Sequence, residues 1–374
     1  MTRARILVVD DEPAMLRGVE RILGDHHDVR GSLSSLEALS IAEEFEPHIA
    51  IIDIRMREMD GFELMNRLKA IDDDVQVILM TGSVFDIDDK LSRAIRERAF
   101  YYISKPFDRQ VLLTLVDRCL ELRAVEEANR MHVAHLESQL AEVRAFQDSM
   151  LPPREAGPKG LRIRAAYQPC VEVAGDLYDY AEIEPGLVAL IIADVAGHGA
   201  SAAMLTGIVK AAFRSSHADR YDPLAVVRRV SDGIGAFEPD RFVTLICARV
   251  SLEGASVEYV NAGHEGGLIV SGSGSVTRLE STGPLISPAF GGLGWEMSSV
   301  PWDAGSLLLL YTDGLSEAAE AGEIFGAERI TSAARDGAGD AGGLLSNLID
   351  EVGKFTGGRP PEDDITLLAV QGDR

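Results

Sequence analysis

Acidic and hydroxyl side chains follow short apolar runs in the first third of the chain. Asp10 and Asp11 follow the first run, Asp53 the second, Thr81 the third and Lys105 the fourth. Because the carboxyl ends of parallel strands meet at one edge of a sheet, we expect these side chains to lie close together. Three carboxylates at one edge repel each other unless a cation lies among them, and oxygen ligands favour Mg²⁺. A divalent ion beside Asp53 would let it attack a phosphoryl group, with Thr81 and Lys105 holding the phosphoryl oxygens.

The apolar runs that position these residues are continuous rather than alternating. They cover residues 6–9, 49–52, 75–80 and 100–103. Continuous runs indicate strands that are buried on both faces, and helix-length intervals between them indicate crossover connections. The pattern therefore predicts a doubly wound parallel α/β sheet over residues 5 to about 118. Taken singly, Asp10, Asp11 and Thr81 could instead be helix N-caps, but capping does not explain all five positions together.

This segment resembles the receiver domain of two-component response regulators. The resemblance rests on Asp10-Asp11, Asp53, Met59-Asp60-Gly61, Thr81 and Lys105-Pro106-Phe107. It implies a five-stranded receiver domain over residues 1–118, a sensor histidine kinase as partner, and Asp53 as the phospho-acceptor. It also implies one Mg²⁺, with ligands Asp11, Asp53 and the Arg55 carbonyl and with Asp10 acting indirectly, and a switch pair of Thr81 and Tyr102. Arg57 stands where this family usually has proline, which puts the stiffness of that loop in doubt.

Residues 109 to 150 contain no glycine and are rich in Leu, Ala, Glu and Arg. Two interleaved series of residues seven apart run through this segment: Leu122, Asn129, Leu136, Val143 and Met150, and Cys119, Glu126, Val133, Leu140 and Gln147. Such a heptad seam predicts a helical coiled-coil linker over residues 119–152, ended by Pro152-Pro153. We interpret it as the helix of a parallel homodimer in which Asn129 fixes the register. The alternative is one amphipathic helix that lies on a neighbouring domain.

Beyond residue 161 the chain becomes rich in predicted strands and in glycine. The predicted strands cover residues 162–167, 188–193, 242–250, 256–261, 307–311 and 365–370, and the predicted helices cover 200–216, 223–235 and 341–355. Strands interspersed with paired helices favour an α+β sandwich over a second doubly wound sheet.

Aspartates again stand at predicted strand ends in this second region. They are Asp176, Asp194, Asp313 and the pair Asp363-Asp364. No Lys or Arg lies within these motifs, so a metal site explains them better than ion pairs, and all-oxygen ligation favours Mg²⁺ or Mn²⁺ over zinc. Two such ions can activate a bridging water for in-line attack on phosphorus. Taken alone, an Asp-Gly pair such as Asp313-Gly314 is usually a turn.

The motifs resemble the metal-dependent PPM-type protein serine/threonine phosphatases, in the bacterial SpoIIE-like branch. The resemblance runs from about residue 145 onward and includes residues 147–152, Tyr259 to His264 and Gly322 to Gly326. It implies an αββα-sandwich domain over residues 153–374 that binds two Mn²⁺ or Mg²⁺ ions. By the resemblance, the metal ligands are Asp194 as the bridge, the Val195 carbonyl, Asp313 and Asp363, with Asp176 holding water or ligating directly and Asp364 as the weaker candidate.

The general acid departs from the eukaryotic pattern. Eukaryotic relatives have a histidine two residues after the bridging aspartate, where this chain has Ala196, and His198 lies four residues after it. Either His198 or a metal-held water would protonate the leaving oxygen, and the sequence leaves both open. His264 is as well explained as a loop residue that satisfies its own backbone.

These features predict a response regulator in which phosphorylation of Asp53 controls a protein serine/threonine phosphatase. The resemblance suggests an anti-sigma factor antagonist as the phosphoprotein substrate. The alternative function is a non-catalytic signalling adaptor that binds partners through the phosphatase fold.

The net charge of the chain is −24, from 36 basic and 60 acidic side chains. Residues 161–374 alone carry 15 basic against 30 acidic side chains, which argues against a nucleic-acid partner. Three widely spaced cysteines without a CxxC pair indicate reduced thiols of the core. The longest apolar run, residues 187–193, is too short to span a membrane, and no signal-like segment opens the chain. We therefore expect a cytoplasmic protein with no membrane partner.

Overall fold

The computed structural model describes residues 3–82, 101–171, 173–197, 199–238, 241–290, 293–303 and 305–373. Contacts divide the chain into two compact units, Met1–Leu136 and Glu137–Arg374. The boundary between the units falls inside one long helix, α5 (Arg109–Met150).

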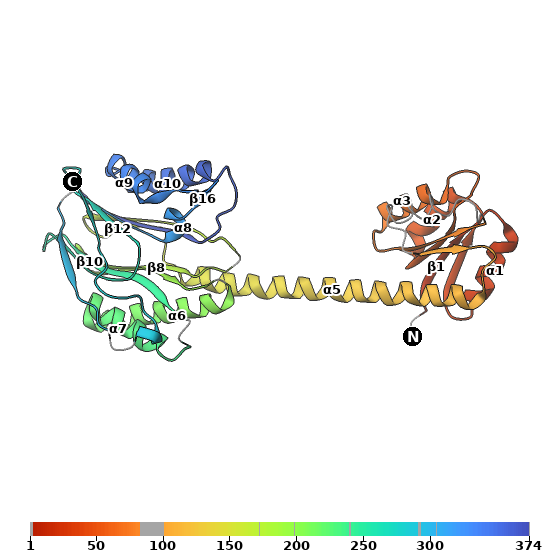
Figure 1. Ribbon diagram of the computed structural model, residues 1–374, viewed down its shortest axis with the longest axis horizontal. Helices are drawn as coiled ribbons and strands as arrows, with labels where there is room; N and C mark the ends of the chain where they lie inside the picture. Colours follow the sequence, from red (N-terminus) through yellow and green to blue (C-terminus); the bar gives the residue numbers. More distant parts are fainter. Residues whose placement is uncertain are drawn as a thin grey trace. The chain divides into compact units, whose positions relative to one another are not determined.

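The first unit alternates strands and helices around a parallel sheet (Figure 1). Within the described residues, the sheet has five strands in the order β2-β1-β3-β4-β5. These strands are β1 (Arg5–Val9), β2 (Asp28–Ser32), β3 (Ile49–Asp53), β4 (Gln76–Thr81) and β5 (Tyr101–Ser104), and the helices between them are α1 (Pro13–Leu23), α2 (Ser35–Phe45) and α3 (Gly61–Ile71). Apolar clusters cover both faces of the sheet, which explains why β3 and β4 are buried along their whole length. The predicted doubly wound sheet is confirmed.

Strand β2 is the element of this sheet that the apolar runs did not reveal. Its sequence is Asp-Val-Arg-Gly-Ser, and it lies at the sheet edge, where β1 is its one partner among the described strands. Because an edge strand is partly exposed, it needs no continuous apolar run, and this one is half-buried with only Ser32 fully inside.

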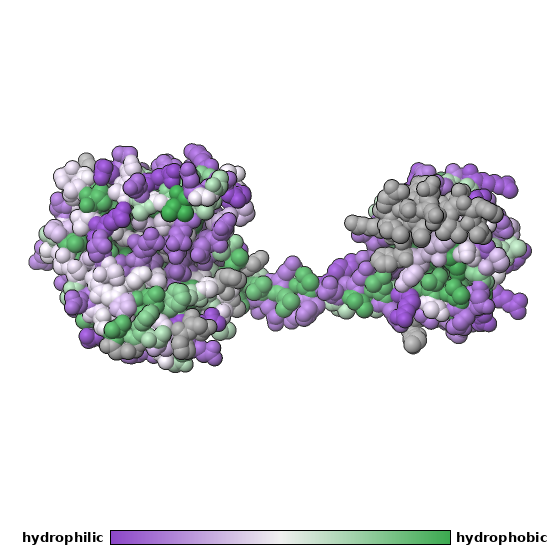
Figure 2. Space-filling model, viewed as in Figure 1, coloured by the Kyte–Doolittle hydropathy of each residue, from purple (hydrophilic) through white to green (hydrophobic). Residues whose placement is uncertain are grey.

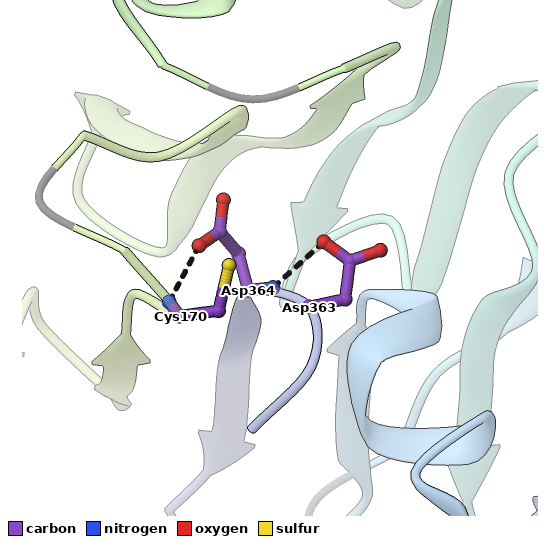
Figure 3. A group of neighbouring side chains, drawn as sticks. All are labelled: Cys170, Asp363 and Asp364. Carbon is purple, nitrogen blue, oxygen red and sulfur yellow. Dashed lines mark hydrogen bonds between the residues drawn. The ribbon is translucent and has the colours of Figure 1, made fainter. Parts of the chain in front are cut away.

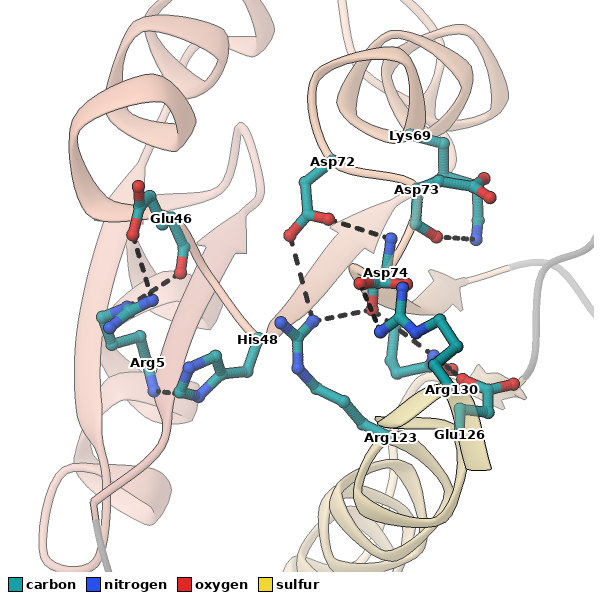
Figure 4. Close-up of polar contacts among 11 residues, drawn as sticks. Arg5, Glu46, His48, Lys69, Asp72, Asp73, Asp74, Arg123, Glu126 and Arg130 are labelled. Carbon is teal, nitrogen blue, oxygen red and sulfur yellow. Dashed lines mark hydrogen bonds and ion pairs between the residues drawn. The ribbon is translucent and has the colours of Figure 1, made fainter. Parts of the chain in front are cut away.

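Helix α5 is held against the first unit by the turn between α3 and β4 (Figure 4). Arg123 donates to the Asp74 carbonyl at 2.7 Å, and Arg130 donates to the Asp74 carboxylate at 2.8 Å. Glu126, which lies between them, accepts from the Gln76 amide at 3.1 Å. Residues 123, 126 and 130 share one helix face, so this polar contact fixes α5 to the sheet to about three turns beyond the predicted receiver boundary at residue 118.

The heptad seam of α5 is not free along its whole length. Cys119 is fully buried in the core of the first unit, and Gln147 is buried in the second unit. Between them, Val133, Leu136 and Leu140 are each at least one-third exposed, and Figure 2 shows apolar side chains on this helix surface. The exposed part of the predicted seam is therefore the middle of the helix.

The second unit is a four-layer sandwich. Its two antiparallel sheets have, within the described residues, the strand orders β14-β11-β10-β9-β8 and β13-β12-β15-β18-β7-β6. One apolar cluster lies between the sheets, a second lies under α6 and α7, and a third lies under α9 and α10 (Figure 1). The predicted αββα architecture is confirmed.

The strands of the first sheet are β8 (Asp176–Glu184), β9 (Leu187–Val195), β10 (Val243–Ser251), β11 (Ser256–Ala262) and β14 (Ser298–Pro301). Those of the second sheet are β6 (Glu155–Ala156), β7 (Leu161–Gln168), β12 (Gly266–Val270), β13 (Val276–Arg278), β15 (Leu307–Tyr311) and β18 (Ile365–Gly372). The covering helices are α6 (Ala200–Ser215), α7 (Pro223–Ile234), α9 (Gly326–Asp336) and α10 (Ala341–Phe355), and the short α8 spans Asp313–Ser316.

Two buried strands of this unit differ from the prediction, and the short strands β6, β13, β14, β16 (Ala319–Glu320) and β17 (Glu323–Ile324) were not predicted either. Asp176 was expected at the end of an apolar strand, but it is the first residue of β8, a strand with acidic and aromatic residues that no apolar run marks. Strand β12, with two glycines, was also not predicted, although all five of its residues are buried.

In the described part of the chain, no helix is long and apolar enough to cross a membrane.

The contact between Asp74 and α5 generates a prediction. Replacement Asp74→Ala removes the carboxylate partner of Arg130, and because partly exposed ion pairs contribute about 1 kcal/mol or less, the fold should persist. We expect amide hydrogen exchange in residues 123–130 of the full chain to quicken by roughly fivefold, the rate equivalent of about 1 kcal/mol. Asp73→Ala, at the exposed neighbouring position, is the control and should leave exchange in α5 unchanged. Equal exchange in both variants would show that the contact does not hold the helix.

Candidate functional site

The carboxyl edge of the first sheet brings Asp10, Asp53 and Lys105 into direct contact. The Lys105 ammonium lies 2.6 Å from a carboxylate oxygen of Asp10 and 2.6 Å from one of Asp53. The second oxygen of Asp53 accepts the backbone N–H of Arg55 at 2.8 Å. These contacts agree with the expectation that the side chains at the strand ends converge.

Burial shapes the ionisation of this group. It raises the pKa of Asp53, although the hydrogen bond from Lys105 opposes the shift. It tends to lower the pKa of Lys105, but hydrogen bonds to Asp10 and Asp53 outweigh it and raise that pKa overall. Asp10, Asp11 and Asp53 with one Lys105 sum to −3 + 1 = −2, a charge that one divalent cation neutralises. The donor set therefore fits Mg²⁺.

The other predicted receiver residues occupy this edge or the adjacent sheet. Asp11 lies 3.7 Å from the guanidinium of Arg57, the residue that departs from the family pattern. Thr81 is buried at the end of β4, where its carbonyl accepts the Lys105 N–H at 2.6 Å. The Tyr102 hydroxyl is buried and has no hydrogen-bond partner among the described residues.

In the second unit, Asp176 and Asp194 lie directly opposite each other on β8 and β9. Asp176 is 2% exposed, and one of its oxygens accepts hydrogen bonds from the Thr312 hydroxyl at 2.8 Å and the Thr366 hydroxyl at 2.5 Å. Burial, followed by the charge of Asp194, raises the pKa of Asp176 well above its usual range. Thr312 directly precedes Asp313 and Thr366 follows Asp364 by two residues, but sequence reasoning assigned neither threonine a role.

Asp194, Asp313 and Asp363 form a group of neighbouring carboxylates, in which the pKa values of Asp194 and Asp313 are raised. Burial first and then Asp313 and Asp363 raise the pKa of Asp194 to about 7. Burial first and then Asp363 raise the pKa of Asp313 to about 6. Among the described residues, no basic side chain forms an ion pair with any of the three. Such a set of oxygen donors without a protein cation fits Mg²⁺ or Mn²⁺.

Asp363 and Asp364 have different surroundings (Figure 3). Asp364 is buried, and its two oxygens accept the backbone N–H groups of Cys170 at 2.8 Å and Gly175 at 2.7 Å. Asp363 is exposed and accepts the Asp364 N–H at 2.8 Å. Asp364 thus holds the loop before β8, while Asp363 keeps an oxygen available, which favours Asp363 as the ligand.

Cys170 was expected in the core but lies only half-buried beside these two aspartates. Its sulfur and one oxygen of each carboxylate are within 4.8 Å of one another. Burial, followed by the charge of Asp364, raises the pKa of the Cys170 thiol to about 12, so the thiol is protonated at neutral pH. Cys119 and Cys247 are buried as expected.

Two glycines of the motifs are required by close backbone contacts. A Cβ atom at Gly175 would lie 2.7 Å from the Val195 carbonyl oxygen, and one at Gly314 would lie 2.1 Å from the Asp364 carbonyl oxygen. Val195 also donates its N–H to the Gly175 carbonyl at 3.2 Å. These contacts hold the backbone next to Asp176 close to that next to Asp194, and the backbone next to Asp313 close to Asp364. His198, a candidate general acid, lies outside the described residues.

The last turn of α5 reaches the loop before Asp176 through Gln147. Its side-chain amide donates to the Ala174 carbonyl at 2.7 Å and accepts the Ala174 N–H at 3.1 Å. The same amide lies 3.5 Å from the Thr206 hydroxyl of α6. Gln147 is 3% exposed, which is unusual for glutamine, and the heptad pattern assigned it to the seam.

Comparison with known proteins identifies both regions. The response regulator receiver domain family matches residues 6–117, and the family of stage II sporulation protein E (SpoIIE) matches residues 184–373. Phosphoserine phosphatase RsbP of Bacillus subtilis is 30% identical over 162 residues, 42% of this chain and 40% of RsbP. Protein IcfG of Synechocystis is 26% identical over 261 residues, 62% of this chain and 41% of IcfG. The chain thus spans about two-fifths of the length of these relatives.

Solved structures share the sandwich fold. The SiaA-PP2C domain of Pseudomonas aeruginosa matches with a TM-score of 0.57 and 21% identity over 65% of this chain and 99% of that domain. The structure of the PP2C domain with a regulatory fragment of SpoIIE from Bacillus subtilis matches with a TM-score of 0.51 and 20% identity, over 58% and 64% of the two chains. The chain belongs to the stage II sporulation protein E family, the SpoIIE-like branch of the PPM-type phosphatases, and joins this domain to a response regulator receiver domain.

Proposed function

We propose that the chain is a metal-dependent protein serine/threonine phosphatase that is controlled by phosphorylation of Asp53. The observation that supports catalysis is the meeting of Asp194, Asp313 and Asp363 with no basic partner among the described residues. A binding scaffold has no physical need for such a costly group of like charges. The name of RsbP, a phosphoserine phosphatase, agrees with this activity.

In the phosphatase domain, Asp194, Asp313, Asp363 and the Val195 carbonyl would hold two Mg²⁺ or Mn²⁺ ions. Bound there, the ions would supply an activated water for in-line attack on phosphorus. Asp176 lies opposite Asp194, and because Thr312 and Thr366 hold one of its oxygens, its other oxygen would hold metal-bound water or ligate an ion directly. The substrate class is a phosphoserine or phosphothreonine protein, and family resemblance suggests an anti-sigma factor antagonist.

In the receiver domain, a phosphoryl group would pass from a histidine of a sensor kinase to Asp53. The P–N bond breaks as the Asp53 oxygen forms a bond to phosphorus. The carboxylate gives up its charge of −1 and carries a phosphoryl group of about −1.5 to −2 instead, at a side chain that Lys105 already contacts. Lys105 lies four residues before α5, so a change in its contacts acts at the start of that helix. Thr81 and Tyr102 are the proposed switch pair. The proposed Mg²⁺ ligands are Asp11, Asp53 and the Arg55 carbonyl.

The metal site yields the first test of this function. We expect Mn²⁺ to raise the melting temperature of the full chain and to support hydrolysis of p-nitrophenyl phosphate, because it neutralises the carboxylates. Asp194→Asn and Asp313→Asn should lower hydrolysis at least 100-fold and abolish the stabilisation of the phosphatase domain, while exposed Asp336→Asn should change neither. If the wild type and Asp313→Asn are equally inactive with every metal, the adaptor function is favoured instead.

Gln147 yields a test of control by the receiver. We expect beryllofluoride, a phosphoryl analogue, to change the hydrolysis rate of the wild type but not of Asp53→Ala. Gln147→Ala should retain hydrolysis and lose most of the beryllofluoride effect, since its contact with Ala174 connects α5 to the loop before Asp176. Gln139→Ala, at an exposed position of the same helix, should respond like the wild type. An undiminished response in Gln147→Ala would exclude this route.

The exposed middle of α5 yields a test of the proposed homodimer. Leu136→Lys with Leu140→Lys places two like charges in the seam, so we expect light scattering to show a dimer for the wild type and a monomer for the variant at micromolar concentrations. Ala134→Lys, outside the seam, should remain dimeric. A monomeric wild type would contradict the dimer.

A further inference from the structure

His264 is a buried histidine that the proposed chemistry does not use. It follows β11 and is 4% exposed. Its backbone is held by Asn261, whose side chain accepts the His264 N–H at 2.8 Å and donates to the His264 carbonyl at 2.9 Å. The backbone N–H and carbonyl of His264 are therefore hydrogen-bonded without the imidazole, and the burial of the ring needs a separate explanation.

Both nitrogens of the ring have partners. Nε2 lies 3.0 Å from the Tyr311 carbonyl oxygen, and Nδ1 lies 2.8 Å from the Thr244 hydroxyl. A carbonyl only accepts hydrogen bonds, so Nε2 carries the proton, and Nδ1 must then accept from Thr244. Burial lowers the pKa of His264 to about 4, so the ring is neutral near pH 7. With both nitrogens occupied and the ring buried, His264 is not available as a general acid.

The two partners lead to two of the proposed metal ligands. Thr244 lies on β10 directly opposite Asp194 on β9. Tyr311 ends β15, two residues before Asp313. Strands β9 and β10 belong to one sheet and β15 to the other, so the imidazole bridges the two sheets beside the carboxylates.

We propose that His264 is a positioning residue that sets the separation of Asp194 and Asp313 by bridging Thr244 and the Tyr311 carbonyl. The proposal rests on the proposed function, since it takes these two aspartates as metal ligands. A hydrogen bond is directional, so it fixes the distance between the sheets more sharply than the apolar contacts around it. Partners outside the ligand shell typically change metal affinity 10- to 100-fold when they are lost.

The test compares Thr244→Val, which removes the hydroxyl at constant size, with Thr244→Ser, which keeps it. The readout is Mn²⁺ affinity of the full chain, measured from the electron paramagnetic resonance of free Mn²⁺, beside circular dichroism and melting temperature. We expect Thr244→Val to weaken Mn²⁺ binding about tenfold with an unchanged spectrum, and Thr244→Ser to bind within about twofold of the wild type. Thr277→Val, on the distant edge strand β13, is the matched control and should bind as the wild type does.

His264→Gln provides a second variant. It should weaken Mn²⁺ binding as Thr244→Val does, and the double variant should be no weaker than either single one, since both remove the same bridge. Unchanged Mn²⁺ affinity in Thr244→Val, or additive losses in the double variant, would overturn the positioning role. A wild type that binds Mn²⁺ but does not hydrolyse p-nitrophenyl phosphate would contradict the proposed function and leave the positioning role standing.

Discussion

The geometry of the phosphatase domain depends on one buried carboxylate, Asp176. Its side chain is 2% exposed and is held by the hydroxyls of Thr312 and Thr366. Burying a carboxylate is costly unless hydrogen bonds compensate, so the two threonines must stay where they are. Because Thr312 follows β15 and Thr366 lies in β18 while Asp176 opens β8, this group joins the two sheets next to the β8–β9 pair in which Asp194 lies opposite Asp176. The like charges that result favour a bound cation.

The two domains differ in how the negative charge of their clustered carboxylates is offset. In the receiver, Lys105 contacts two of the three carboxylates, and the remaining charge of −2 matches one divalent ion. In the phosphatase domain, no described basic side chain pairs with Asp194, Asp313 or Asp363, and burial, followed by the charges of Asp313 and Asp363, raises the pKa of Asp194 to about 7. Basic residues do balance a buried aspartate elsewhere in this domain, where Lys210 and Arg214 contact Asp179. The lack of a described basic partner at Asp194, Asp313 and Asp363 is therefore specific to that site, because basic side chains do reach a buried aspartate elsewhere in the domain.

The apolar runs predicted the doubly wound sheet and an α+β sandwich, and the positions at strand ends predicted that Asp10, Asp53 and Lys105 lie close together. Sequence reasoning missed features whose signal is not apolar. Strand β2 is a polar edge strand, and β8 begins with the aspartate that was expected to follow a strand. Gln147 was assigned to the seam because heptad spacing does not show which side a polar residue faces. Thr244 and His264 are 20 residues apart in sequence, and their contact depends on how the strands pair. The spacing of residues along the chain reveals neither.

The central claim is that Asp194, Asp313 and Asp363 together form a site for divalent cations. Anomalous diffraction at the manganese absorption edge, from crystals of the full chain grown with Mn²⁺, tests it most directly. We expect two anomalous peaks in the phosphatase domain, both within ligand distance, about 2 to 2.5 Å, of an Asp194 oxygen or a neighbouring oxygen donor of this group. A map with no peak there, or with a single peak at the Cys170 sulfur, would contradict it.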